Sequence, residues 1–312
     1  MQKHVAIFSH EDDLHSLAIL NESLQDEIIK VHIIGTNSLL LRGGFTWDSK
    51  HSDQGFLKTS IGNCIDPSSL DLIWWRRPHL PLDLPTESMS VDHVNFAAAE
   101  WKWAINGLLQ STFRGKWVNH PTTELLASNK LHQLQIAKKL GFKIPATLIS
   151  QDPHQILRFC EEHGGKIIIK KIYGTYEKQT LTCEIELEDI RNNPNTRLCP
   201  AIYQQKIDSN IHIRANCFGE KIHSFIIKSR ILDWRADLTS PMENYALDNA
   251  TESMLISFLK YFNLRMGVFD LILRDNEIVF LEINPQGQFL FCEALTSTPL
   301  RRYFYEFLLS EV

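Results

Sequence analysis

Acidic and amide side chains near the C-terminus give the strongest chemical signal in this 312-residue sequence. Asp270 lies in one apolar, strand-like run, and Glu282 and Asn284 lie in the next. A turn at Asp275 and Asn276 makes the two runs a hairpin, and strand residues two apart share a face. We therefore expect the three side chains to meet and to bind Mg²⁺, which prefers oxygen ligands. An exposed strand face, or carboxylates paired with arginine, is the alternative.

Four basic residues stand where they could bind phosphate groups. Lys130 opens a predicted helix, whose first N–H groups favour anions. Lys170 follows three isoleucines at the end of a predicted strand, Arg214 lies on an alternating strand, and Arg235 follows an Asp-Trp pair. Together with Mg²⁺ these cations would neutralise a triphosphate. Taken singly, each is better explained as an exposed charge or a member of a surface ion pair.

A string of two tryptophans, two arginines and a proline ends a predicted buried strand at residues 74–78. Arginine binds planar carboxylates through two parallel hydrogen bonds, so Arg76 and Arg77 are candidates for binding an acidic substrate. Packing at the end of the strand is the alternative.

Composition and missing motifs exclude several classes of protein. The 32 Lys and Arg against 37 Asp and Glu give a net charge of −5, which argues against a duplex DNA-binding protein. The glycine-rich phosphate loops and the serine and zinc hydrolase motifs are absent. The six cysteines form no Cys-x-x-Cys pair, and neither a secretory signal nor a membrane span is recognisable. We therefore expect a cytoplasmic protein that binds neither nucleic acid nor membrane.

The first third of the chain predicts a small open α/β domain. Strands are expected at residues 5–8, 31–34 and 72–75, with a helical face between the first two. A long helix over residues 91–109 carries Phe96, Trp101 and Trp103, which we expect to pack against that sheet. Residues 39–59 could form a hairpin.

The remaining two thirds predict a compact strand and helix unit followed by antiparallel hairpins. Helices are expected over residues 130–140, after Asp152-Pro153 and over 251–262. Strands are expected at 147–149, 167–171 and 180–183, with a turn at 173–176, and hairpins at 211–227 and 268–283. The fold class is therefore α/β (α+β), with domains at residues 1–118, 119–200 and 201–312.

The motifs resemble those of ATP-grasp ligases, and more closely those of the graspetide synthetases, the microviridin-type ligases that cross-link ribosomal peptides. The resemblance covers nearly the whole chain, and the Glu-x-Asn-Pro-Gln-Gly-Gln string at residues 282–288 is its most specific part. The other matching positions are Asp12-Asp13, residues 74–78, residues 117–121, Asn129-Lys130, Gln133-Leu134, residues 141–145 with Thr147, Lys170, residues 211–214 with Gly219, residues 233–235 and Asp270.

The resemblance implies a role for each matching position. Lys130 and Lys170 would hold ATP phosphates, and Gln205 and Ile207 would offer backbone groups to adenine, with Asp208 near the ribose. Catalysis would use Arg214 and Arg235 on the γ-phosphate and the acyl phosphate, and Mg²⁺ would bind Asp270, Glu282 and Asn284. His212, close to Arg214, and Lys206, at the expected adenine edge, depart from the family pattern.

The implied activity is ATP-dependent formation of ester or amide cross-links in a precursor peptide made of a leader and a core. The family often forms homodimers, which nothing in the residues supports independently. Three further functions remain open, namely a ligase that adds an amino acid or glutamate to a carboxylate, a phosphotransferase, and an ATP-dependent peptide-binding protein without turnover.

Overall fold

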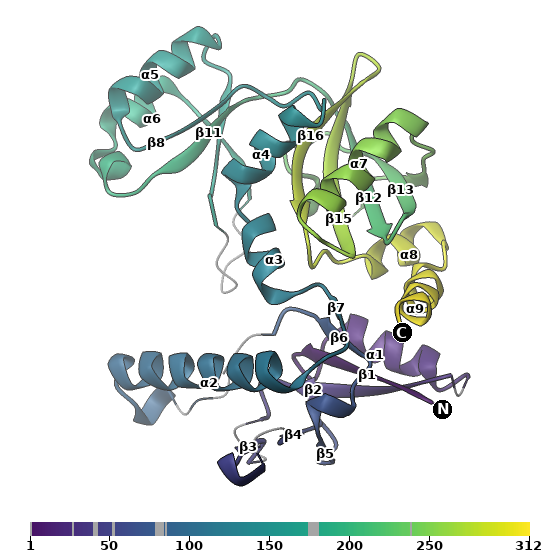
Figure 1. The fold of residues 1–312 in the computed structure, drawn as a ribbon. Coiled ribbons are helices and arrows are strands. Elements are labelled where there is room, and N and C mark those ends of the chain that lie inside the picture. The colour runs from purple at the N-terminus through teal and green to yellow at the C-terminus, as the bar shows by residue number, and fades with distance from the viewer. Residues whose placement is uncertain are drawn as a thin grey trace. The chain divides into compact units, whose positions relative to one another are not determined.

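The computed structural model describes residues 2–26, 28–39, 43–51, 54–78, 84, 86–173, 181–237 and 239–312. The contacts divide the chain into two compact units. The first unit joins Met1–Pro121 to Thr298–Val312, and the second is Thr122–Ser297. Figure 1 labels the helices and strands of both units.

A parallel four-stranded sheet in the order β2-β1-β6-β7 forms the centre of the first unit (Figure 1). Its strands are β1 (Lys3–Ser9), β2 (Ile29–Gly35), β6 (Leu72–Trp75) and β7 (Lys116–Val118). Ala6 and Phe8 face the C-terminal half of α2 (Val91–Thr112), where Ile105 and Leu109 are buried. Because both faces of the central strands are covered, their sequences are continuously apolar.

The other side of this sheet involves helices from opposite ends of the chain. Helix α1 (Leu14–Ser23) contacts α9 (Leu300–Glu311), and the ring of Trp74 lies 4.5 Å from that of Phe304. Arg301 Nε lies 2.7 Å from Oε1 of Glu22, which is almost fully buried. Helix α9 is therefore an integral part of the first unit, and the sequence analysis did not predict it.

A small antiparallel sheet, β3 (Phe45–Trp47), β4 (Gly55–Lys58) and β5 (Cys64–Ile65), completes this unit. The hairpin expected over residues 39–59 is therefore confirmed in β3 and β4, although residues 40–42 and 52–53 lie outside the described part.

The expected packing of α2 is wrong in part. Trp101 packs against the core of the unit, but the side chains of Phe96 and Trp103 are 68% and 76% exposed.

The second unit contains a four-stranded sheet in the order β10-β9-β11-β8. Its strands are β8 (Thr147–Ser150), β9 (Ile167–Lys170), β10 (Cys183–Ile185) and β11 (Ala201–Gln205). One face packs against α5 (Pro153–Glu162) and α6 (Leu187–Asn192), with Ile167 and Tyr203 in that core. Since side chains alternate along a strand, Lys170 and Gln204 lie on the opposite face. The turn and strand start expected over residues 174–180 lie outside the described residues.

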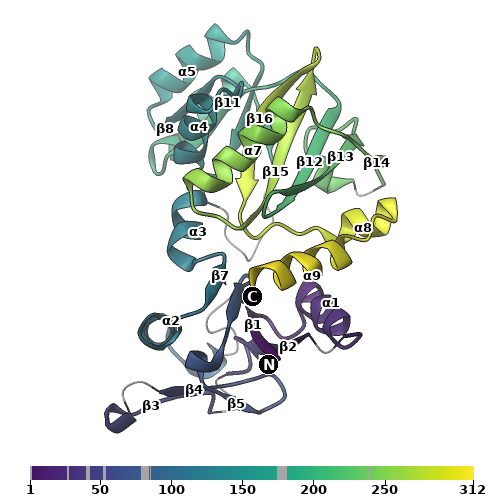
Figure 2. The same cartoon turned by 45° about the vertical axis from the view of Figure 1, so that its right-hand side comes forward.

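A five-stranded antiparallel sheet in the order β14-β13-β12-β15-β16 forms the rest of the second unit (Figure 2). Its strands are β12 (Ile211–Phe218), β13 (Lys221–Lys228), β14 (Met242–Asn244), β15 (Met266–Arg274) and β16 (Glu277–Asn284). Besides α5 and α6, the helices in this part of the chain are α3 (Pro121–Ala127), α4 (Lys130–Lys139), α7 (Asn249–Tyr261) and α8 (Leu290–Thr296). Both predicted hairpins are confirmed as β12–β13 and β15–β16.

Two elements lie on the other side of the predicted domain boundaries. Strand β11 pairs with β8 and β9, so a boundary at residue 200 would separate it from its own sheet. Helix α9 groups with the first unit, whereas the prediction placed it in a domain of residues 201–312. The three-domain division itself stays a prediction. Within the described residues, no helix is long and apolar enough to cross a membrane.

Candidate active site

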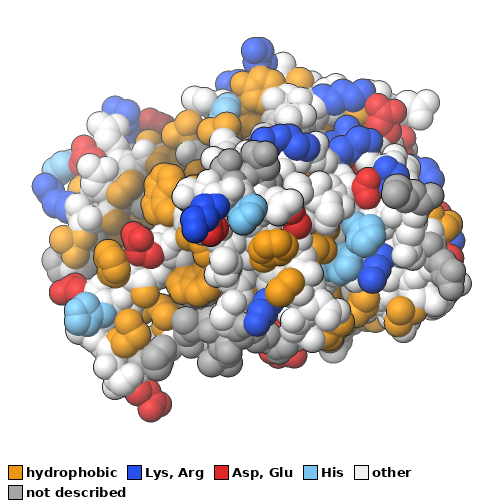
Figure 3. Space-filling model, turned by 60° about the horizontal axis from the view of Figure 1, so that its bottom comes forward, with side chains coloured by type: hydrophobic (Ala, Val, Ile, Leu, Met, Phe, Trp, Pro, Cys, Tyr) orange, Lys and Arg blue, Asp and Glu red, His pale blue; other side chains and the backbone are white. Residues whose placement is uncertain are grey.

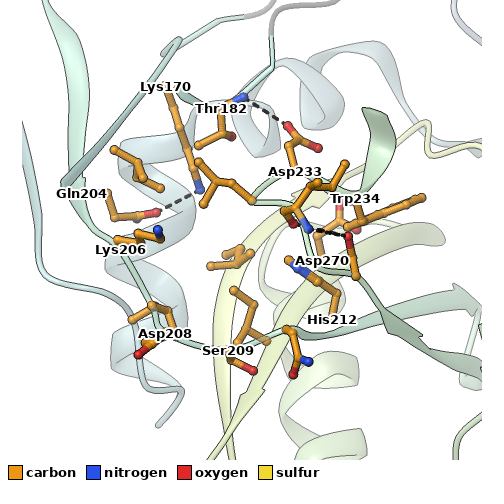
Figure 4. Close-up of a pocket in the computed structure, with 18 of the residues that line it drawn as sticks. Lys170, Thr182, Gln204, Lys206, Asp208, Ser209, His212, Asp233, Trp234 and Asp270 are labelled. Carbon is orange, nitrogen blue, oxygen red and sulfur yellow. Dashed lines mark hydrogen bonds between the residues drawn. The ribbon is translucent and has the colours of Figure 1, made fainter. Parts of the chain in front are cut away.

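A cavity of about 570 Å³ lies in the second unit and is lined by both of its sheets. Residues 206–210, which connect β11 to β12, and residues 229–235, which follow β13, complete the lining. Figure 4 shows the polar side chains that surround this space. The charged members of the lining are Lys170, Glu184, Lys206, Asp208, Arg230, Asp233, Arg235, Asp270 and Glu282.

The register of the five-stranded sheet brings the predicted acidic pair together. Asp270 on β15 lies directly opposite Glu282 on β16, and the pairing shifts at a bulge between Asp270 and Leu271. On its other side Asp270 lies opposite Arg214 of β12. The expected meeting of Asp270 and Glu282 is therefore confirmed, with an arginine as an additional neighbour.

Two lysines control the charge of Glu282. Lys130, the first residue of α4, places its Nζ 2.8 Å from Glu282 Oε2. Burial alone would raise the pKa of Glu282, but the charges of Lys130 and Lys170 lower it to about 2. Burial lowers the pKa of Lys170 to about 8, although the charge of Glu282 opposes that shift. Glu282 is therefore ionised at neutral pH in a strongly positive environment.

Both terminal nitrogens of Arg214 are held by hydrogen bonds within the second unit. Its Nη1 donates to both carboxylate oxygens of Asp270 at 2.8 and 2.9 Å, and its Nη2 donates to the Gln288 carbonyl at 2.9 Å. The guanidinium carbon also lies 5.8 Å from the ring centre of Trp234 and 5.5 Å from that of Phe291. Such aromatic contacts stabilise a cation while leaving its charge in place.

Arg235 is fixed by a second carboxylate. Its Nε and Nη2 donate to the two oxygens of Asp233 at 2.7 and 2.5 Å, and these bonds raise the pKa of Arg235. The backbone N–H of Thr182 donates to the same carboxylate, as Figure 4 shows. Burial would raise the pKa of Asp233, but Arg235 lowers it to about 2. The positive charge of Arg235 is therefore permanent and fixed in place.

The remaining predicted site residues of the second unit are Gln205, Ile207, Asp208 and Asn284. Gln205, Ile207 and Asp208 line the cavity, where Asp208 is exposed and the Ile207 carbonyl accepts a bond from the Ser209 N–H. Asn284 Oδ1 accepts from the Gln286 N–H at 2.9 Å, so the amide helps to shape a turn. The binding roles of these four residues stay predictions.

Arg76 and Arg77 belong to the first unit and differ in how deeply their side chains are buried. The side chain of Arg76 has no exposed surface, and its Nη2 lies 3.3 Å from His15 Nδ1 and its Nε 3.5 Å from Asp13 Oδ1. The side chain of Arg76 is fully buried beside Asp13 and His15, and its role in substrate binding stays a prediction. Arg77 is half-buried with a positive φ of 45°. Its role in substrate binding stays a prediction.

The donor set is compatible with the predicted Mg²⁺ site. Asp270 and Glu282 supply two carboxylates from adjacent strands, and Asn284, two residues after Glu282, supplies an amide oxygen. Mg²⁺ takes oxygen ligands of this kind, and phosphate and water fill its other positions. Asp270 and Glu282 already have cationic partners, so the ion would share each carboxylate. Within the described residues, no cluster of three or more His, Cys, Asp or Glu offers an alternative metal site.

Gln133 of α4 holds the strand that carries Glu282. Its side chain is buried, accepts from the Ile283 N–H at 3.1 Å, and donates to the Ile283 and Ala127 carbonyls at 2.9 and 2.6 Å. This side chain satisfies both backbone groups of the residue next to Glu282. It is therefore a support for the site and not a part of the cavity.

Replacing Gln133 by Leu would leave the Ile283 N–H and two carbonyls without their partner. We expect the free energy of unfolding to fall by about 3 kcal/mol, because each buried polar group left unpaired costs about 1–3 kcal/mol. Denaturant unfolding measures this change. Gln135 lies on the same helix and is exposed, so Gln135→Leu is the matched control and should change stability by less than about 0.5 kcal/mol. Equal stabilities for the two variants would contradict the supporting role.

Several residues that shape the cavity had no role assigned to them from the sequence. Asp233 was noted only as a neighbour of Arg235, yet it fixes that side chain. Gln204 is buried, and its side chain bonds to Lys170. Its signal in the sequence is that it follows the core residue Tyr203 on the same strand, so that its side chain lies on the opposite face of the sheet. His212 lines the cavity, where burial lowers its pKa despite the nearby Asp270. The pairing of Lys206 with Glu184 at 2.5 Å had no local signal.

The cavity thus combines fixed cations with ionised carboxylates, which is the arrangement that binds and polarises a polyphosphate. Residues 127–300, more than half of the chain, match the family model of the RimK-like ATP-grasp domain. The chain belongs to the RimK-like ATP-grasp family. The matched range includes both sheets that line the cavity of this ATP-grasp protein. No curated protein matches its sequence.

Solved structures resemble this ATP-grasp protein over its whole length. The macrocyclase MdnC from Microcystis aeruginosa MRC, bound with precursor peptide MdnA, is 26% identical with a TM-score of 0.87, and the match covers 98% of this chain and 99% of that one. A RiPP-associated ATP-grasp ligase from Chryseobacterium gregarium, in complex with ADP and a leader and core peptide, is 22% identical with a TM-score of 0.88, covering 100% and 98%. The ATP-grasp ligase PsnB, complexed with a phosphomimetic precursor variant, Mg and ADP, is 15% identical with a TM-score of 0.77, covering 100% and 99%.

Proposed function

We propose that this ATP-grasp protein is an ATP-dependent ligase that forms ester or amide cross-links within a ribosomally made precursor peptide. The observation that carries the proposal is that three cations, Lys130, Lys170 and Arg235, act on Glu282 of the cavity and keep it ionised. A full-length likeness to the macrocyclase MdnC, which was solved with its precursor peptide, supports a peptide as the substrate.

The proposed chemistry has two steps. A carboxylate oxygen of the peptide attacks the γ-phosphorus of ATP, the bond to the bridging oxygen breaks, and ADP leaves. A Ser or Thr hydroxyl, or a Lys amine, then attacks the acyl carbon, loses its proton, and expels phosphate. Positioning of the two reactants supplies much of the rate. The net result is one ester or amide bond and the loss of one water from the peptide.

The residues of the cavity have distinct roles in this scheme. Lys130 and Lys170 would bind the phosphates of ATP, and Arg235 would stabilise the charge that develops on the transferring group. Asp270, Glu282 and Asn284 would hold Mg²⁺, which supplies Lewis-acid stabilisation of the phosphate oxygens. Arg214 is bound to Asp270 and would orient that carboxylate. Gln205, Ile207 and Asp208 would contact the adenosine.

A ligase that adds a free amino acid or glutamate to a carboxylate is the second candidate. It would use the same acyl phosphate, and membership of a RimK-like family favours it over a phosphotransferase or a peptide-binding protein without turnover. The two ligases differ in the second reactant, which lies within the same peptide in one case and is a separate molecule in the other.

Mass spectrometry distinguishes these functions. The purified protein is incubated with ATP, Mg²⁺ and the peptide encoded next to its gene, and ADP release is followed in parallel. Loss of one water per bond supports the cross-linking ligase, and a gain of one amino-acid residue supports the second candidate. A stable phosphorylated product, or binding of ATP without ADP release, would contradict both ligase proposals.

Arg77 provides a test of peptide binding in the first unit. We expect Arg77→Ala to lower peptide turnover about tenfold, because a charge-assisted bond to the substrate would be lost, and to leave the affinity for ATP within about twofold. Kinetics with varied peptide and nucleotide titrations measure the two effects. The exposed Arg114 of the same unit is the control position, where Ala should have no effect. Equal losses of turnover and ATP affinity would assign Arg77 a structural role.

We also propose that the protein forms a homodimer and works in the cytoplasm. The N-terminal half of α2 has no buried residue up to Ile105, and it extends past the sheet of its unit (Figure 1). Its exposed Phe96 and Trp103 lie seven residues apart, on one face of the helix. Exposed apolar groups among charged ones are also visible on one face of the molecule (Figure 3). Light scattering of the wild type and of Trp103→Ser tests the dimer, which this variant should weaken.

A further inference from the structure

A chain of hydrogen bonds lies behind Lys170, on the face of the four-stranded sheet that meets the cavity. Lys170 Nζ donates to Gln204 Oε1 at 2.9 Å, as Figure 4 shows, and Gln204 Nε2 donates to Thr147 Oγ1 at 2.9 Å. The Thr147 hydroxyl in turn donates to the Pro145 carbonyl at 2.8 Å. The chain crosses from β9 through the central strand β11 to β8 and ends on a backbone group.

The strand register builds this chain. Gln204 lies directly opposite Thr147 on one side and opposite Ile168 on the other, and Ile202 lies opposite Lys170. Since strand residues two apart share a face, the three side chains of the chain all point to the same side of the sheet. The opposite face of these strands packs against α5 and α6, so the backbone that carries the chain is held in place.

The direction of the bonds depends on Thr147. The side-chain amide of glutamine can present either its oxygen or its NH₂ group, and its neighbours determine which. The Thr147 proton is used by the Pro145 carbonyl, so its oxygen accepts and the Gln204 NH₂ group faces it. The Gln204 oxygen must then face Lys170. If the amide were flipped, its NH₂ group would face the Lys170 ammonium group, and two donors would meet.

The chemistry of the partner also matters for Lys170. Lys130 and Lys206 pair with carboxylates, at 2.8 Å to Glu282 and 2.5 Å to Glu184, whereas the hydrogen-bond partner of Lys170 is a neutral amide. A neutral acceptor fixes the position of an ammonium group without cancelling its charge. The charge of Lys170 is therefore not cancelled by its hydrogen-bond partner, and it acts on anions in the cavity, as it does on Glu282.

We propose that Thr147 and Gln204 are positioning residues that orient the Lys170 ammonium group toward the phosphates of the bound nucleotide. Thr147 acts through Gln204, which is almost fully buried, and need not touch the nucleotide itself. This inference rests on the proposed function, because it takes the nucleotide phosphates as the group that Lys170 binds.

Paired substitutions at Thr147 test the chain. Thr147→Val keeps the shape of the side chain and removes the acceptor, whereas Thr147→Ser keeps the hydroxyl. We expect Thr147→Val to weaken binding of ADP with Mg²⁺ about tenfold, since an oriented charge-assisted contact is lost, and Thr147→Ser to stay within about twofold. Calorimetric titration of the full chain measures both constants, and melting temperatures show whether each variant is folded. If Thr147→Val does not fold, Thr147→Ala takes its place with the same expected loss.

A double-mutant cycle separates positioning from general stabilisation. In a Lys170→Met background, Thr147→Val should weaken ADP binding no further, because the group that it positions is absent. An equal loss in both backgrounds, or wild-type affinity in folded Thr147→Val, would overturn the inference. Gln204→Glu should also weaken binding, because a carboxylate would cancel the charge of Lys170. If the wild type itself binds no ADP, the proposed function fails, which is a different outcome from a failure of the chain.

Discussion

Replacement of Glu282 by Gln is expected to lower turnover at least about a hundredfold, the loss typical of removing one fixed group that stabilises charge in the transition state. Glu282 faces the cavity, lies opposite Asp270, and is kept ionised by Lys130 and Lys170. The amide would keep the volume of the side chain but would lose the charge that holds a divalent cation. Release of ADP at saturating ATP and Mg²⁺ measures the effect.

The control for this prediction lies on the same strand. Glu277 begins β16, is more than half exposed, and pairs with Lys143 at 2.6 Å on the surface. Glu277→Gln should leave ADP release unchanged, because an exposed ion pair contributes little. If Glu282→Gln releases ADP at the wild-type rate, Glu282 does not bind the metal ion. Raising the Mg²⁺ concentration should partly restore a Glu282→Asp variant, which keeps the charge.

Replacement of Arg214 by Met is expected to reduce both stability and turnover. The variant leaves Asp270, with only 14% of its side chain exposed, without the guanidinium that pairs with both of its oxygens. Breaking a buried pair by removing one partner typically costs about 3–5 kcal/mol. Turnover should fall about a hundredfold, because the carboxylate is no longer oriented toward the cavity. Urea unfolding and ADP release measure the two effects separately.

A matched substitution on the neighbouring strand shows whether the effect is specific. Arg274 ends β15, is 42% exposed, and pairs with Asp275 at 3.3 Å. Arg274→Met should change the free energy of unfolding by less than about 0.5 kcal/mol. Arg214→Lys should recover part of the stability but little of the turnover, since an ammonium group cannot reproduce the two parallel bonds. An unfolding free energy of Arg214→Met equal to that of the wild type would contradict the assigned role.

The local part of the site could be predicted from the sequence. The turn at Asp275 and Asn276 pairs Leu271 with Phe280, so the hairpin itself follows from neighbouring residues. That register alone would place Leu281 opposite Asp270, and the bulge between Asp270 and Leu271 brings Glu282 there instead. The sequence therefore predicts the hairpin and the approach of the two acidic residues, but not the bulge that aligns them. Lys170 was predictable as the end of an apolar strand, because it follows three isoleucines.

The partners of these residues could not be predicted in the same way. Arg214 meets Asp270 only because β12 lies beside β15, a contact between positions 56 residues apart in the chain. The apolar periodicity of α2 predicted packing for Phe96 and Trp103, but the sheet is too narrow to cover the N-terminal half of so long a helix. Burial of Arg76 required Asp13 and His15, which come from the start of the chain.

The attachment of α9 to the first unit has a consequence for synthesis of the protein. The ribosome completes the whole second unit before it makes Phe304, the residue whose ring packs against Trp74. Until then α1 alone covers that face of the newly made parallel sheet, although domains generally fold in the order in which they emerge. A protein shortened by its last dozen residues would therefore lose the integrity of its amino-terminal half, and its cavity residues would all still be present.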